Sequence, residues 1–144
     1  MNAEIIQKYK DKTIKELLKT AERHFNEYIR FRDSENGWGF CISSGRPIKV
    51  PAVNSQAGHF YSAGKFPALR FNENNVHLQG KSDNYFNSGN LAEYRKNLVK
   101  KIGKKAVDDL DFIASATKRN THKWDRFYLI EVIETYKQKK KTVK

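Results

Sequence analysis

Residues 56–94 alternate short extended runs with polar turns, in an order typical of a small β-hairpin followed by a helix. A first run carries His59, and a second ends in Asn75-Val76-His77. A polar turn then opens a helix at Asn84. This stretch therefore predicts a hairpin that presents a histidine close to the start of a helix. It limits the possible folds of the chain more than any other segment does.

A histidine on a hairpin and an amide on the next helix are the main parts of a ββα-metal, or HNH-type, nuclease site. The histidine activates the attacking water, and the helix offers oxygen ligands to a divalent cation at the scissile phosphate. In such sites one asparagine cross-bonds the loop that holds the histidine, and another offers its amide oxygen to Mg²⁺ or Mn²⁺. His59, Asn75 and Asn84 are the candidates for these roles, and His77 is a candidate second metal ligand.

Each candidate also has a plainer interpretation. A lone histidine in a strand is often a structural residue, and asparagines commonly occupy turns or cap helices. Alternation places His77 on the same face as Asn75, so it can equally well buttress the strand. Gly58 allows close backbone approach, and the other candidates lie one hairpin away from His59. These neighbours favour the catalytic interpretation of His59.

Charge narrows the choice of partner. The chain has 28 Lys and Arg against 16 Asp and Glu, a net charge of +12, concentrated in residues 95–105 and 137–144. It contains no run of about 18 apolar residues and no signal-peptide core, so we expect DNA rather than a membrane, and a cytoplasmic location. The single cysteine, Cys41, fits a reducing compartment. The candidate DNA-binding residues are Arg70, Arg95, Lys96, Lys100, Lys101, Lys104 and Lys105.

The pattern of elements predicts one α+β domain, in which flanking helices surround a ββα-metal core. Thr13 and Glu16 have the spacing of a capping box, and apolar residues recur after them at helical intervals. Inside the core, one helix is expected from residue 83 or 84 to Ile102, with Gly103 as its C′ residue. The expected segments of the domain 1–144 are an N-terminal helix at 14–32, the nuclease core at 38–103, C-terminal helices at 104–138 and a frayed basic tail at 139–144.

Over about residues 26–136 the chain resembles the phage lambda NinG (Rap) family of recombination endonucleases. The matching segments include residues 26–33, 41–45, 56–60, 69–73, 75–77, 88–90, 93–95 and 122–127. The resemblance implies a metal-dependent endonuclease of phage or prophage recombination, in a bacterial host, that cuts branched DNA such as Holliday junctions. It also implies that His59 is the general base, Asn84 a metal ligand and Asn75 the orienting residue. Cleavage of two strands at a junction suggests a homodimer.

The chain departs from the family pattern at a structural zinc knuckle. Relatives commonly carry two C-x-x-C pairs, whose places are taken in this chain by Cys41, Ser44, Gly80 and Asp83. Structural zinc needs four good ligands, so we expect no structural zinc. Packing by Trp38 and Phe40, and a helix cap from Asp83, are the candidates for holding the hairpin instead.

A second departure concerns the catalytic metal. Gly58 stands where many related nucleases have an acidic metal ligand. His77, a backbone carbonyl, the DNA phosphate and water would then complete the coordination of Mg²⁺ or Mn²⁺. Both departures leave an alternative open, a DNA-binding recombination accessory protein that keeps the nuclease fold without efficient cleavage. The presence of both His59 and Asn84 favours the enzyme.

Overall fold

A computed structural model describes residues 1–86, 90–117 and 122–144 of the chain. Within these ranges no helix is long and apolar enough to cross a membrane. The chain divides into two compact units, one made of residues 1–28 and 123–144 and the other of residues 29–122. Both helices and small sheets are present, so the chain has a mixed α+β composition.

The first unit is helical. Its elements are α1 (Ala3–Lys8), most of α2 (Ile14–Arg32), α5 (Arg126–Lys139) and the 3₁₀ turn η4 (Lys140–Thr142). The predicted capping box is confirmed at the start of α2, where the N–H of Glu16 donates to the Thr13 hydroxyl (3.1 Å) and the N–H of Thr13 donates to the Glu16 carboxylate (3.3 Å). This cap explains why the helix begins at the residue that the sequence predicts.

Aromatic packing and the basic tail hold α5 against α2 inside this unit. The Tyr136 ring lies 4.8 Å from the Phe25 ring, centroid to centroid, with the two planes nearly perpendicular. The ammonium groups of Lys140 and Lys144 lie 2.9 and 2.5 Å from the Glu27 carboxylate. The prediction of a frayed tail is therefore wrong, because Glu27 on α2 binds its lysines.

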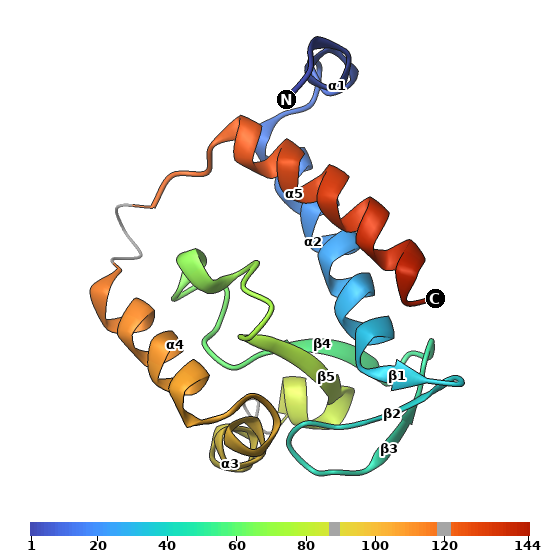
Figure 1. Ribbon diagram of the computed structural model, residues 1–144, viewed down its shortest axis with the longest axis vertical. Helices are drawn as coiled ribbons and strands as arrows, with labels where there is room; N and C mark the ends of the chain where they lie inside the picture. Colours follow the sequence, from blue (N-terminus) through green and yellow to red (C-terminus); the bar gives the residue numbers. More distant parts are fainter. Residues whose placement is uncertain (87–89, 118–121) are drawn as a thin grey trace. The chain divides into compact units, whose positions relative to one another are not determined.

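The second unit contains two small antiparallel sheets. The strands β1 (Ser34–Glu35), β2 (Trp38–Phe40) and β3 (Pro47–Lys49) form one sheet in that order, and β4 (Ser55–His59) pairs with β5 (Val76–Gly80) in the other. Asn36 and Gly37 both have positive φ, which is the backbone of a two-residue turn between β1 and β2. Figure 1 shows the pairing of β4 with β5, which confirms the predicted hairpin.

The predicted single helix after this hairpin is instead two elements. A π-helical turn, η2 (Ser82–Phe86), follows β5, and α3 (Leu91–Ile102) begins later. Asn90, the residue before α3, has φ 47 and ψ 56, a left-handed conformation that cannot continue a right-handed helix. Gly103 has φ 90 and ends α3, as the sequence predicts.

Two apolar clusters form the core of the second unit. The larger one joins α3 to α4 (Lys104–Ala116) and to the 3₁₀ turn η1 (Pro67–Leu69). Its buried members are Ile42, Phe60, Leu69, Tyr94, Leu98, Val107 and Leu110. The smaller one comprises Cys41, Ile48, Val50 and Leu78. Within the larger cluster the Tyr94 hydroxyl donates to the Gly58 carbonyl oxygen (2.6 Å), which fixes α3 onto β4 directly before His59.

Candidate functional site

His59 ends strand β4, opposite Val76 of β5. Its Nε2 lies 3.0 Å from the Arg70 carbonyl oxygen, and a carbonyl can only accept, so this nitrogen carries the proton. The lone pair is then on Nδ1. Burial is the main cause that lowers the pKa of His59 from 6.5. The ring is therefore neutral at pH 7, which is the form required of a general base.

Asn75 is completely buried and fastens the loop that follows His59. Its amide oxygen accepts from the N–H of Tyr61 (2.9 Å), and its amide nitrogen donates to the carbonyl oxygens of Tyr61 (2.9 Å) and Leu69 (3.2 Å). The loop between these two residues leads directly to Arg70, whose carbonyl binds His59. Asn75 thus occupies the position of a residue that orients the histidine.

Asn84 lies on η2 and lines the same groove as His59. The groove has a volume of about 850 Å³, and Lys65 and Arg95 also line it. Among the described residues that line it, none carries a carboxylate. The structure therefore brings the candidate base and the candidate metal ligand together in a basic depression suited to a phosphate group.

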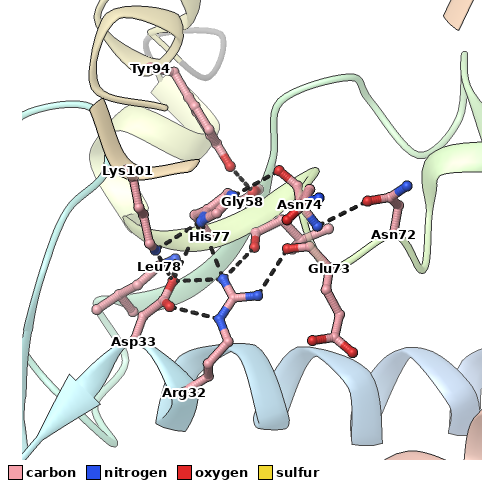
Figure 2. A network of polar contacts seen from close by, with 11 residues as sticks. Arg32, Asp33, Gly58, Asn72, Glu73, Asn74, His77, Leu78, Tyr94 and Lys101 are labelled. Atoms are coloured by element: carbon pink, nitrogen blue, oxygen red, sulfur yellow. Dashed lines mark hydrogen bonds and ion pairs between the residues drawn. The ribbon is translucent and has the colours of Figure 1, made fainter. Parts of the chain in front are cut away.

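His77 lies on the other face of the hairpin, opposite Gly58. Its Nε2 is 2.8 Å from the Asn74 carbonyl oxygen and its Nδ1 is 2.8 Å from the Lys101 ammonium, so one nitrogen donates and the other accepts (Figure 2). Burial is the main cause that lowers the pKa of His77 to about 3. With both nitrogens engaged by the protein, the structure does not support His77 as a metal ligand beside Asn84.

Asp33 stands at the centre of the polar network in Figure 2. Its carboxylate accepts hydrogen bonds from Arg32 Nε (2.8 Å) and from the N–H of Leu78 (2.9 Å), and it lies 2.9 Å from the Lys101 ammonium. Burial alone would raise the pKa of Asp33, but these cationic partners outweigh burial and lower the pKa to about 2. The network joins the end of α2, strand β5 and helix α3.

Arg32 extends the network to the loop before β5. Its guanidinium donates to the carbonyl oxygens of Glu73 (2.9 Å) and Val76 (2.8 Å). Sequence reasoning missed this function of Arg32 and Asp33, which looked only like a helix end followed by a turn. The available signal was an adjacent Arg-Asp pair directly after an apolar helical run, where a buried ion pair can join a helix to a sheet.

The positions compared above with a zinc knuckle, Cys41, Ser44, Gly80 and Asp83, lie close together. The Cys41 thiol donates to the Asp83 carboxylate (3.3 Å), and the Cys41 sulfur accepts from the N–H groups of Gly80 (3.3 Å) and Ser44 (3.5 Å). Within the described ranges, no group of three or more His, Cys, Asp or Glu side chains is arranged to hold a metal. Asp83 also accepts from the Asn90 side chain (3.1 Å). Hydrogen bonds to one thiol thus connect the first hairpin to η2.

Trp38 and Phe40 do not hold the hairpin as we expected. Their side chains are 54% and 69% exposed, because both point away from the core on strand β2. Gly39 between them faces inwards. The expected packing role therefore passes to Cys41 and to its smaller apolar cluster.

A side chain at position 58 would collide with Gln79 on the neighbouring strand. A Cβ built on Gly58 would lie 2.9 Å from the Cβ of Gln79 and would overlap its amide oxygen. Gln79 is completely buried, and its amide nitrogen donates to the Ser43 hydroxyl (2.8 Å). A buried glutamine therefore fills the space that a side chain at position 58 would need.

The candidate DNA-binding residues differ in their exposure and in their partners. Lys96 and Lys100 are exposed on α3. Arg95, Lys104 and Lys105 pair with Asp111 (2.6 Å), Asp108 (2.8 Å) and Asp109 (3.2 Å). The two lysine pairs are exposed and therefore weak, so a phosphate can compete for these lysines. Arg95 is held more firmly, because two of its nitrogens donate to Asp111. Lys101 differs, because it binds Asp33 and His77 and is committed to the polar network. Arg70 is half-buried and contributes its backbone carbonyl to His59.

Comparison with known proteins establishes the family. A family model described as Bacteriophage Lambda NinG protein matches residues 2–144, and the chain belongs to this family. Protein ninG of Escherichia phage lambda is 34% identical over 127 residues, which is 88% of this chain and 57% of that protein. The same-named proteins of Enterobacteria phage H19B (36% over 107 residues; 74% and 48% covered) and Salmonella phage P22 (35% over 127 residues; 88% and 57%) are similar.

The chain spans about half the length of the curated relatives that it matches. No solved structure matches it. The predicted membership of the NinG family is thus confirmed.

Proposed function

We propose that this NinG-family chain is a metal-dependent DNA endonuclease with a ββα-metal site. The observation that carries the proposal is that His59 and Asn84 line one basic groove, from a hairpin and from the helical turn that follows it. The hydrogen bonds of Asn75 add support, because they fasten the loop between the base and the carbonyl that orients it.

The proposed reaction is hydrolysis of a phosphodiester bond. Nδ1 of neutral His59 accepts a proton from water while the water oxygen attacks phosphorus. The bond from phosphorus to the 3′ oxygen breaks, that oxygen takes a proton from solvent water, and His59 releases the proton that it accepted to solvent. The products carry a 5′-phosphate and a 3′-hydroxyl. The hydrogen bond from Nε2 to the Arg70 carbonyl keeps the ring oriented and stabilises the imidazolium that forms.

A divalent cation, Mg²⁺ or Mn²⁺, would be held through the amide oxygen of Asn84. When bound, it supplies positive charge to the phosphoryl group and to the leaving oxygen. The described lining of the groove is without carboxylates, so the DNA phosphate and water would provide most of the remaining ligands. Mg²⁺ usually keeps several waters, and this donor set suits it.

Branched DNA, such as a Holliday junction, is the proposed substrate in phage or prophage recombination. The proposal of this substrate follows the NinG resemblance, and a homodimer would allow two strands of a junction to be cut. The exposed Lys96 and Lys100 are proposed phosphate contacts, and Lys65 and Arg95 are suited to contact the strand in the groove.

The test uses the purified full chain with a four-way junction and a linear duplex of matched sequence. Cleavage is measured with Mg²⁺, with Mn²⁺ and with EDTA. We expect metal-dependent cleavage of the junction, reduced by about 10²-fold or more in His59→Ala, which removes a positioned base. Binding of the junction in EDTA should be unchanged in this variant. Undiminished cleavage by His59→Ala would overturn the assignment.

Asn84→Ala tests the metal ligand, and Asn74→Ala is its matched control because Asn74 is exposed outside the groove. Asn84→Ala should lose cleavage and regain part of it at higher metal concentration, while Asn74→Ala should cut normally.

The absence of acidic groups from the described groove lining also favours a second function, a non-catalytic DNA-binding accessory protein. Junction binding by the wild type without cleavage under any metal condition would favour that function.

A further inference from the structure

Strand β2 presents two aromatic side chains to solvent, outside the catalytic groove. Trp38 and Phe40 are separated by one residue and are 54% and 69% exposed. Gly39 between them is buried, and a Cβ at this position would collide with the Asp33 carbonyl oxygen and the Leu78 side chain. The strand cannot turn over to bury the aromatic rings, because its other face has no room for any side chain.

The neighbouring strand adds positive charge to this aromatic face. Trp38 is paired with Lys49, and Phe40 is paired with Pro47, and residues directly opposite in an antiparallel pair share a face. Lys49 is exposed, as is Arg46, which directly precedes β3. Lys49 therefore shares a face of the sheet with the two aromatic rings, and the exposed Arg46 directly precedes the strand.

The same aromatic rings line a depression of about 510 Å³, together with Asn97 and Lys101 of α3. Two acidic residues also line it, Asp33 and Glu35. The carboxylate of Asp33 is neutralised by its ion pairs with Arg32 and Lys101. Glu35 on β1 is the remaining acidic group, and Lys49 on β3 lies across β2 from it. The depression has room for a planar ring.

We propose that Trp38 and Phe40 form a stacking platform for unpaired bases of single-stranded DNA, with Lys49 and Arg46 contacting the adjoining phosphates. Aromatic side chains next to cations bind single strands because every base has a flat face and every linkage a negative charge. In an intact duplex those base faces are already stacked and hidden. This inference rests on the proposed function only in taking DNA as the ligand, and it adds that unpaired segments are recognised away from the groove of His59.

The experiment measures binding of a ten-nucleotide oligothymidylate and of a blunt duplex, both in EDTA so that no cleavage occurs. Trp38→Ala and Phe40→Ala should each weaken single-strand binding about tenfold, the scale of one lost stacking contact, with duplex binding within twofold of wild type. Trp38→Tyr should retain most of the affinity. Phe112→Ala is the matched control, because Phe112 is 72% exposed on α4, and it should bind both ligands normally.

Fluorescence gives a second readout. In a Trp124→Phe background, Trp38 is the one remaining tryptophan, and the oligothymidylate should quench its emission with the same dissociation constant. Melting temperatures check that the variants fold. We expect them to fold, because the side chains of Trp38 and Phe40 are exposed and contribute little to the core. Unchanged single-strand affinity in Trp38→Ala/Phe40→Ala, equal losses on both ligands, or absence of quenching would each overturn the proposal. Because no step requires catalysis, failure of the platform is distinguishable from failure of the endonuclease.

Discussion

Asn75 and Tyr61 are joined by two hydrogen bonds of 2.9 Å, in which the asparagine amide binds both the N–H and the C=O of the tyrosine backbone. A side chain that satisfies both groups of another residue imitates a strand partner. It therefore extends the pairing of β4 and β5 beyond His59 to Tyr61, two residues further along the chain, where the loop leaves the hairpin.

Loss of this pairing should affect both stability and cleavage. Asn75→Ala leaves the backbone groups of Tyr61 without their partner, and it should lower the free energy of unfolding by about 1–3 kcal/mol. Cleavage should fall further than the folded fraction does, because the Arg70 carbonyl is no longer held in place for His59. Denaturant unfolding and cleavage are measured together. Asn74→Ala, at an exposed position, should stay within about 0.5 kcal/mol of wild type.

The buried His77 predicts a pH dependence of stability. Its folded pKa of about 3 lies below the ordinary 6.5, so the unfolded chain binds a proton that the folded chain does not. The contribution of His77 is complete above pH 6.5 and is lost progressively as the pH falls towards 3. Asp33, with a folded pKa of about 2 against 3.8, contributes above pH 3.8 and loses its contribution only at lower pH.

Unfolding by denaturant at pH 7 and pH 4.5 checks this prediction, since that interval contains the effect of His77 and little of that of Asp33. His77→Gln keeps a donor for Asn74 and an acceptor for Lys101, and it should show a smaller loss of stability between the two pH values. His122→Gln is the control. Equal pH dependence in wild type and His77→Gln would show that the histidine does not titrate as described.

Two adjacent lysines on α3 should behave differently. Lys100 is exposed, so Lys100→Gln should leave stability unchanged and reduce the slope of log K against log salt by about 0.9, the value for one phosphate contact. Lys101→Gln removes a partner of Asp33 and His77, and it should destabilise the chain by about 1–3 kcal/mol. Salt titrations of DNA binding and melting curves separate the two effects. A stable Lys101→Gln protein with a flattened salt slope would show that Lys101 is a phosphate contact after all.

The thiol of Cys41 predicts how the protein responds to chelators. With hydrogen bonds to Asp83, Gly80 and Ser44 in place of metal bonds, purified protein should contain far less than one zinc per chain. EDTA should abolish cleavage and leave the melting temperature nearly unchanged, since a structural metal would have contributed folding free energy. Cys41→Ser keeps a donor for Asp83 and should be close to neutral. One tightly bound zinc, with a large loss of stability in Cys41→Ser, would contradict this.

The sequence predicted some elements to the residue and others poorly, for physical reasons. Helix α2 spans 14–32 as predicted, because a capping box and an apolar stripe are local signals. The predicted helix after β5 is divided at Asn90, which takes a left-handed conformation. The sequence does not distinguish such an asparagine from one that caps a helix in the ordinary way. The six-residue α1 was missed since it has no buried residue to give it a pattern.

The candidate site likewise contains features that the sequence could predict and others that it could not. His59, Asn75 and Asn84 were identified from one contiguous stretch. Asn75 fastens the loop that follows His59, and Asn84 lines the same groove as His59. His77 was assigned to the metal because strand alternation could not reveal that Asn74 and Lys101 engage both of its nitrogens. The contact with Lys101 joins residues 24 positions apart in the chain, and no local pattern reports it.

The close approach of Gly58 and Gln79 couples the choice of residue at the two positions. While glutamine fills that space, a side chain at position 58 must displace the Gln79 side chain, whose amide nitrogen donates to the Ser43 hydroxyl. A carboxylate at position 58 therefore requires a compensating change at position 79. An engineer who wishes to add an acidic residue before His59 must design the two positions together.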